Sequence, residues 1–206
     1  IARIKSFDFF TNYFLPRVAL EDLMAVKDWN RTQNKLIYDK KLFNPDSKKW
    51  TPEVPSYQEA YEVYKEILDI SENKKTSFVS LSIKHHSPFI AKDWTNTIIE
   101  QIHNNMKEKD KASTVKSIDF LSDMTSQTNY EEIKNSINTL QQEQIKKLMM
   151  IESSADYVYF VLDAPYAPEK KYEPKRTQIV ILGTLFGFII SILFSIFLKF
   201  RASSRI

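Results

Sequence analysis

The end of the chain holds one uninterrupted apolar stretch, Ile179-Val-Ile-Leu-Gly-Thr-Leu-Phe-Gly-Phe-Ile-Ile-Ser-Ile-Leu-Phe-Ser-Ile-Phe-Leu198. None of its residues is charged. A helix of about 20 residues, rising about 1.5 Å at each, matches a hydrocarbon core about 30 Å thick. Basic residues flank both ends: Lys175, Arg176, Lys199 and Arg201. Side chains of this kind anchor a membrane helix by reaching the lipid headgroups. A buried core helix would rarely be so uniformly apolar, so the sequence predicts a transmembrane helix over residues 177–198.

The chain before this stretch is polar, and the mean hydropathy of the whole is −0.37. We expect a water-soluble α/β domain over residues 1–164, which is long enough for one domain with its own core. A proline-rich connector follows over residues 165–176, and a short tail over 199–206 ends the chain. The connector is marked by Pro165, Pro168, Pro174 and Lys175.

Several classes of site are excluded by composition. Both glycines, Gly183 and Gly187, lie in the apolar stretch, so the rest of the chain cannot build a glycine-rich phosphate loop or a Gly-x-Ser-x-Gly nucleophile turn. The absence of cysteine excludes disulfides and thiolate metal sites. The net charge of the chain is only +3, and lysines are interspersed with acidic residues along it, so we expect no nucleic-acid partner.

The remaining titratable residues do not suggest catalysis. Adjacent strand positions face opposite sides, so His85 and His86 cannot easily ligate one ion; we expect surface positions for the histidines and no metal site. Acidic residues such as Asp110 and Glu131 lie in polar helical segments, without the apolar surroundings that tune a catalytic carboxyl. We therefore expect no enzyme, no catalytic residue and no cofactor.

Helical spacing of apolar residues predicts helices over residues 4–15, 19–29 and 57–70. Pro16 is expected to end the first, and Ser56 with Glu59 to form a capping box at the start of the third. Residues 30–55 lack periodicity, with a turn expected at Asn44-Pro-Asp-Ser.

The second half of the domain combines two predicted strands with a very long helical region. Strict alternation predicts a strand over residues 77–85, and an apolar run predicts another over 157–163. Ser87 and Pro88 are typical of a helix start, and Trp94, Ile98, Ile102 and Met106 then recur every four residues. No proline or glycine interrupts residues 89–153, which predicts either one very long helix or a helical hairpin. A single helix would measure on the order of 100 Å and need neighbouring chains beside it.

Small residues recur every four positions in the apolar stretch, at Gly183, Gly187, Ser191 and Ser195. They line one face of a helix and would permit close approach of another membrane helix. The alternative is that small residues are simply common in membrane helices, but we favour a packing face.

Three separated motifs carry a resemblance to a known family: Ser82-Ile-Lys-His-His-Ser-Pro-Phe-Ile-Ala-Lys-Asp-Trp94, Ser117-Ile-Asp-Phe-Leu121 and Asp163-Ala-Pro-Tyr-Ala-Pro-Glu-Lys-Lys-Tyr-Glu-Pro-Lys-Arg176. Together they resemble the chain-length determinant proteins, the Wzz-type polysaccharide co-polymerases. The resemblance implies an α+β periplasmic domain with a small sheet and a very long helix, followed by a C-terminal transmembrane helix. Because the chain starts at Ile1, it also implies a first transmembrane helix before that residue. With eight residues after Leu198, we expect the type without a kinase domain.

The resemblance also implies a function and a location. Members form rings of protomers in the bacterial inner membrane, with most of each chain in the periplasm, and set the modal length of a polysaccharide made by a separate polymerase. We therefore expect a non-catalytic regulator of a surface polysaccharide, most simply lipopolysaccharide O-antigen. Its expected partners are further copies of the chain, the membrane, the polymerase and the growing polysaccharide. The alternative is a tail-anchored coiled-coil tether, pairing through residues 133–151, with no polysaccharide role.

Overall fold

The computed structural model describes residues 1–51, 53–169, 171 and 176–203, and the side chains of the last helix from Thr177 to Ser191. The chain divides into two units, Ile1–Ala167 and Pro168–Ile206.

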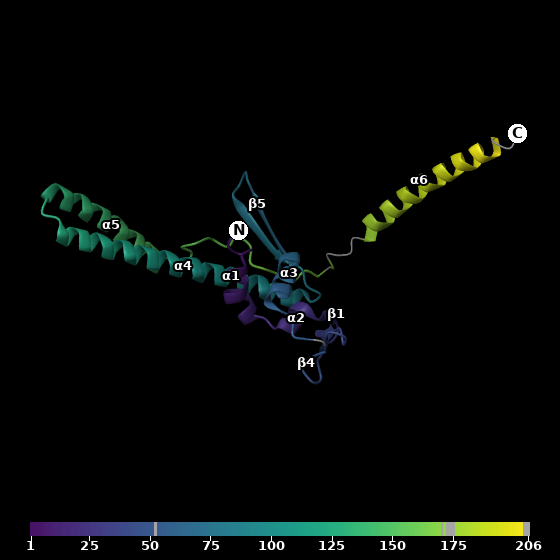
Figure 1. The fold of residues 1–206 in the computed structure, drawn as a ribbon, viewed down its shortest axis with the longest axis horizontal. Coiled ribbons are helices and arrows are strands. Elements are labelled where there is room, and N and C mark those ends of the chain that lie inside the picture. Colours follow the sequence, from purple (N-terminus) through teal and green to yellow (C-terminus); the bar gives the residue numbers. More distant parts are fainter. Residues whose placement is uncertain (52, 170, 172–175, 204–206) are drawn as a thin grey trace. The chain divides into compact units, whose positions relative to one another are not determined.

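The first unit is α+β, as predicted, with small two-stranded sheets and a long helix (Figure 1). Its elements in chain order are α1 (Phe7–Phe9), the π-helical turn η1 (Phe10–Phe14), the 3₁₀ turn η2 (Leu15–Arg17), α2 (Leu20–Met24), β1 (Val26–Asn30), β2 (Lys35–Tyr38), β3 (Phe43–Asn44), β4 (Lys49–Trp50), α3 (Tyr57–Ile67), β5 (Leu68–Asn73), β6 (Phe78–Ile83), α4 (Pro88–Gln127) and α5 (Glu131–Ser153).

The first predicted helix is present but differs at both ends. Ser6 caps it by accepting a hydrogen bond from the Phe9 N–H at 3.1 Å, so α-helix begins at Phe7. The turns then change from α to π to 3₁₀ and continue to Arg17. Pro16 does not end them, because it lies in the first turn of η2, where its fixed φ fits and no amide donor is needed.

Two predicted helices were too long. The helix expected over residues 19–29 ends at Met24, and β1 takes its second half. The capping box of α3 is confirmed, since Ser56 Oγ accepts from Glu59 N at 3.2 Å and Glu59 Oε2 accepts from Ser56 N at 2.8 Å. However, α3 ends at Ile67, and β5 buries Leu68 and Ile70 while exposing Asp69 between them.

The described strands form three antiparallel pairs, β1–β2, β3–β4 and β5–β6. The predicted strand over residues 77–85 is confirmed as β6. The segment 30–55, expected to be irregular, contains strands, although the turn at Asn44 is confirmed: its Oδ1 accepts from Asp46 N at 3.0 Å. The strand predicted over residues 157–163 was wrong, because these residues belong to none of the described strands.

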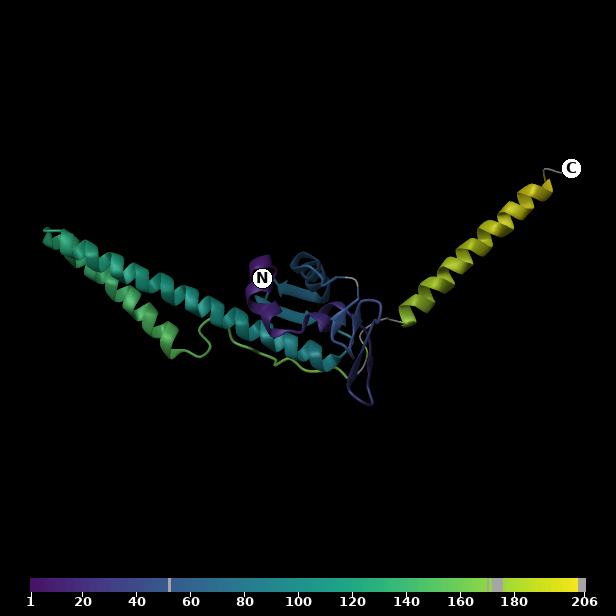
Figure 2. The same cartoon turned by 60° about the horizontal axis from the view of Figure 1, so that its bottom comes forward.

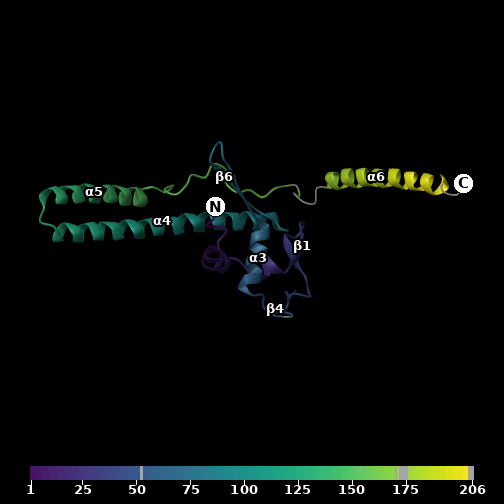
Figure 3. The same ribbon diagram turned by 45° about the horizontal axis from the view of Figure 1, so that its top comes forward.

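The long helical region is a hairpin, so the single-helix alternative was wrong. Ser87 caps α4 and Pro88 occupies its first turn, as predicted. After Gln127 the backbone becomes extended at Thr128 and Tyr130, and α5 runs back beside the outer part of α4 (Figure 3). With 40 residues, α4 is about 60 Å long.

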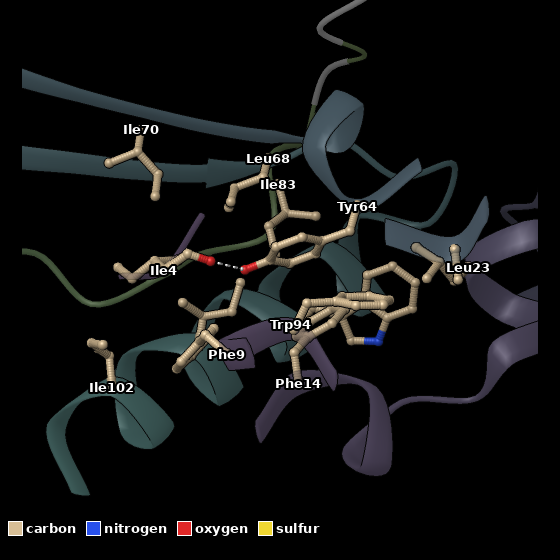
Figure 4. Close-up of a cluster of buried hydrophobic side chains, with 13 residues drawn as sticks. Ile4, Phe9, Phe14, Leu23, Tyr64, Leu68, Ile70, Ile83, Trp94 and Ile102 are labelled. Carbon is tan, nitrogen blue, oxygen red and sulfur yellow. Dashed lines mark hydrogen bonds between the residues drawn. The ribbon is translucent and has the colours of Figure 1, made fainter. Parts of the chain in front are cut away.

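The hydrophobic core joins the N-terminal turns, α3, the β5–β6 pair and the first half of α4 (Figure 4). Tyr64 lies at its centre, with its ring centroid 5.0 Å from Phe10 and 4.8 Å from Phe14. The predicted four-residue spacing on α4 is confirmed by the burial of Trp94, Ile98 and Ile102. Met106, the next position, is partly exposed because the core ends before it.

The second unit contains α6 (Arg176–Ser203). In the part of the chain that the structure describes, no helix has both the length and the apolar character needed to cross a membrane.

Candidate functional site

The outer part of the α4–α5 hairpin is the candidate site, because it projects beyond the core (Figures 1 and 2). Beyond Ile102, α4 packs mainly against α5 and contributes nothing further to the core cluster. Of the 23 residues of α5, only Ile137 and Ile151 are buried. Two helices that bury so few apolar residues are weakly stabilised by their mutual packing.

Polar contacts hold the open end of the hairpin together. Lys111 on α4 forms an ion pair with Glu152 on α5, and Lys107 Nζ donates to the Ser154 carbonyl at 3.2 Å. The hydrogen bond from Lys111 holds the pKa of Glu152 below its usual range, so this carboxylate stays charged. These contacts join α5 to α4 at the point where α5 ends.

The residues after α5, hereafter the return segment (154–167), run along α4 toward its N-terminal end (Figure 3). Tyr157 OH donates to Asp110 Oδ2 at 3.1 Å, and Tyr159 OH donates to the Ile99 carbonyl. The Tyr159 ring also contacts His103, and burial raises the pKa of Tyr159 to about 12. The sequence predicted a strand at a sheet centre for residues 157–163, whereas Tyr157 and Tyr159 bind this part of the chain to a helix.

Large apolar side chains remain exposed on the outer hairpin: Phe120, Met124, Ile133, Leu140, Ile145, Met149 and Met150. Some of them border an open groove of about 430 Å³, which is lined by Ser113, Lys116, Ser117, Phe120, Leu121, Leu140 and Gln144. Phe120 and Leu140 both line this groove, and apolar residues that lie together on an otherwise polar surface are typical of a protein contact site. Hereafter these exposed residues and the groove are called the hairpin surface.

Two buried polar atoms lie on α4 near this surface. Among the described residues, Asn105 Oδ1 and Thr114 Oγ1 are buried without a hydrogen-bond partner. A buried polar atom without a partner costs about 1–3 kcal/mol. The α4 helix is therefore not optimised for packing along this part of its length.

The predicted packing face lies in the second unit. Gly183, Gly187 and Ser191 follow one another at four-residue spacing on α6, which places them on one face of the helix. A Cβ atom added at either glycine would meet nothing within 4 Å. The fourth member, Ser195, is helical, but its side chain lies outside the described residues. The large apolar residues of α6 from Ile179 to Ile190 are exposed.

The connector residues are only partly described. Pro165 and Pro168 lie outside helices and strands, whereas Pro174 and Lys175 lie outside the described residues.

The expectation that histidines occupy the surface is wrong for His85. Its Nε2 lies 3.1 Å from the Asp22 carbonyl and its Nδ1 accepts from Ser87 N at 3.0 Å, so the ring joins α2 to the start of α4. Its ring centroid also lies 4.9 Å from Trp94. Within the described residues, no group of three histidine or carboxylate side chains could hold a metal ion.

No protein-family model, curated protein or solved structure matches this chain.

Proposed function

We propose that this chain is a non-catalytic, oligomeric regulator of the modal length of a surface polysaccharide, with lipopolysaccharide O-antigen as the polymer. In this proposal residues 1–164 lie in the periplasm, residues 177–198 cross the inner membrane, and residues 199–206 are cytoplasmic. Several copies form a ring that acts as a scaffold for a separate polymerase and its growing chain. The resemblance of residues 82–94, 117–121 and 163–176 to chain-length determinant proteins supports this assignment.

One structural observation carries the oligomer part of the proposal, namely the hairpin surface. The outer part of the α4–α5 hairpin has apolar side chains on its outside and few between its helices. A neighbouring copy that packs against this surface would bury those side chains and compensate for the weak packing within the hairpin.

The membrane anchor is proposed from the sequence. Residues 179–198 contain no charge and basic residues flank them on both sides. The structure describes side chains for this stretch as far as Ser191, and the large apolar ones among them are exposed. Exposure of such residues is favourable in lipid and unfavourable in water.

The tether is disfavoured by the position of α5. A coiled-coil tether would use residues 133–151 to pair with another chain. In the first unit this helix already pairs with α4 of the same chain, burying Ile137 and Ile151. A membrane helix upstream of Ile1 in the intact protein would exclude the tether, because a tail anchor has a single span.

The decisive experiment is a gel of lipopolysaccharide from the source bacterium, with and without the gene. If the protein regulates length, its loss converts a clustered distribution of long chains into a smooth one while polymer persists. Complementation with the intact gene restores the cluster. Complete loss of polymer would point to an enzyme of synthesis, and an unchanged pattern would contradict a role in O-antigen length.

A further inference from the structure

The positive charge of this chain is concentrated in one short segment. Residues 26–50 contain six lysines and one arginine against three aspartates, a net charge of +4. The remaining residues contain 22 basic and 23 acidic side chains, a net charge of −1, so this segment accounts for the positive charge of the whole protein. All six lysines of the segment are exposed: Lys27, Lys35, Lys40, Lys41, Lys48 and Lys49.

The segment forms a compact pair of hairpins, β1–β2 and β3–β4, hereafter the basic double hairpin (residues 26–50). Phe43 is buried between Tyr38 and Trp50, with ring centroids 5.4 and 5.2 Å away. Two of the aspartates are engaged locally: Asp28 Oδ1 accepts from Trp29 N, and Asp39 Oδ1 accepts from Lys41 N. The strand pairing and the aromatic cluster therefore fix the backbone of the segment, and its lysines lie on the outside of this framework.

Apolar residues accompany the lysines on the outside. Ile37 is 46% exposed and Leu42 is 40% exposed. Trp29 and Trp50 are half-buried, so part of each indole ring is accessible. Lysine with aliphatic and indole side chains is the combination found where proteins contact the headgroup region of a bilayer.

The basic double hairpin lies at the N-terminal end of α4, the end opposite the hairpin surface (Figures 1 and 3). The Trp29 ring contacts Phe89 in the first turn of α4, with centroids 6.0 Å apart. Tyr38 OH donates to Asp22 Oδ1 at 2.6 Å, and Asp39 N donates to the Ala25 carbonyl at 2.8 Å. These contacts fix the basic double hairpin to the core.

The chain also leaves the first unit at this end. Tyr159 of the return segment hydrogen-bonds to the Ile99 carbonyl, which is closer to the N-terminal end of α4 than the contacts at Lys107 and Asp110. The segment then continues toward that end, away from the hairpin surface (Figure 3). Residues 168–176, which follow it, can span at most about 30 Å even when fully extended. If residues 177–198 are a membrane anchor, the end of the first unit nearest the bilayer is therefore the end that carries the lysines.

From this placement we infer that the basic double hairpin docks on the surface of a bilayer containing anionic phospholipids. Lys40, Lys41, Lys48 and Lys49 contact the headgroups, and Ile37 and Leu42 enter the interface. The inference rests on the proposed membrane anchor and adds to it a second contact with lipid, made by the basic double hairpin. Each lysine near an anionic surface favours the docked state by roughly fivefold.

The absence of cysteine from the sequence makes a direct test possible. The full chain carrying Ser47→Cys, in the turn between β3 and β4, is labelled with a fluorophore and reconstituted into nanodiscs. The discs contain phosphatidylcholine with or without phosphatidylglycerol, and a lipid with a nitroxide on its headgroup quenches any fluorophore that reaches the surface. We expect strong quenching in anionic discs at low salt, and weak quenching in discs of phosphatidylcholine alone or at high salt.

Two variants provide the controls. Replacing Lys40, Lys41, Lys48 and Lys49 with Gln should remove most of the anionic-lipid-dependent quenching. The same change at Lys109, Lys116, Lys146 and Lys147, which are exposed on α4 and α5, should leave it intact. A label at Ser122→Cys, on exposed α4, should be quenched in neither type of disc.

The outcomes separate this inference from the proposed function. If the chain enters discs but the label at position 47 is not quenched, or is quenched equally without anionic lipid, the docking inference is overturned and the anchor stands. If the full chain does not associate with discs, the anchor and the docking inference both fall.

Discussion

Tyr64 connects the first residues of the chain to α3 through one buried hydrogen bond. Its hydroxyl donates to the Ile4 carbonyl at 2.9 Å, and the ring is fully buried among Phe10 and Phe14 (Figure 4). Burial raises the pKa of Tyr64, so the hydroxyl keeps its proton and remains a donor at any physiological pH. The bond therefore ties the N-terminal turns to the core.

Replacing Tyr64 with Phe should destabilise the first unit by about 1–3 kcal/mol, because the Ile4 carbonyl loses its donor in a buried position. The ring is retained, so core packing should change little. Urea unfolding of the chain in detergent, followed by tryptophan fluorescence, measures the change. The matched control is Tyr57→Phe, at a side chain that is 63% exposed, where a comparable loss would contradict the role of the buried bond.

His85 gives the first unit a dependence on pH. Burial lowers the pKa of His85 below its ordinary value of 6.5, with a smaller effect from His86. The unfolded chain therefore binds a proton at this ring more readily than the folded chain, and protonation favours unfolding. The stabilisation is complete above about pH 6.5 and is lost as the pH falls from there through the lower folded pKa.

Thermal unfolding measured from about pH 7 down to about pH 5 should show a falling Tm, and His85→Gln should flatten that slope whatever its absolute Tm. His86→Gln is the control, since the His86 side chain is exposed and should leave most of the slope in place. Equal slopes in the parent protein and His85→Gln would show that another group titrates.

The α4–α5 hairpin is the element on which the proposed oligomer depends. Phe120 is 62% exposed on the hairpin surface, and Phe78, with a similar exposure of 59%, lies on β6 away from it. Phe120→Asn should lower the oligomeric mass in detergent or lipid while leaving the unfolding transition unchanged, because an exposed side chain contributes little to the monomer. Phe78→Asn should leave the mass unchanged. Analytical ultracentrifugation separates the two results, and equal masses for both variants would remove the hairpin surface from the proposal.

Sequence patterns predicted elements well where local chemistry decides them. The starts of α3 and α4 follow from Ser56, Glu59, Ser87 and Pro88, whose side chains or rings act on their own helix. The end of α3 was placed too late, because Leu68 and Ile70 suit a helix and a strand equally and pairing with β6 decides between them. Residues 157–163 were predicted to form a strand because their apolar character is typical of one, but the Tyr157 and Tyr159 hydroxyl groups donate hydrogen bonds to α4.

The helix break at residues 128–130 had only a weak local signal, the polar run Thr125-Ser-Gln-Thr-Asn129. It contains neither glycine nor proline, and the sequence therefore left a single helix and a hairpin as alternatives. The decision depends on the packing of α5 against α4, which is a tertiary effect. The hairpin surface was missed for the same reason, because which apolar residues of α5 remain exposed depends on how it packs.

At the scale of the whole molecule, the net charge of the chain conceals how unevenly its charges are distributed. A net charge of +3 over the chain indicates little, whereas +4 over residues 26–50 marks one end of the first unit. A count along the sequence could have identified this segment. Its position at the base of α4 could not be predicted, because it depends on β1 replacing the second half of an expected helix.

The face of α6 that carries Gly183 and Gly187 provides a test of the proposed assembly. Replacing Gly187 with Leu should weaken packing against another membrane helix, lower the oligomeric mass and disturb length control in cells. The monomer should fold normally, because a Cβ at this position meets nothing within 4 Å. Leu185→Phe adds bulk to a different face of the helix and is expected to be neutral. Unchanged mass and unchanged polysaccharide length in Gly187→Leu would show that the face is not used.

The continuity of α4 gives the first unit a mechanical property. One end of this helix is fixed in the core by Trp94 and Ile98, and the other carries the hairpin surface. Because the helix is about 60 Å long, a tilt of about 1° in the core moves its far end by about 1 Å. Small adjustments at the base are thus amplified at the far end, so copies that touch along their hairpins would share any change in inclination.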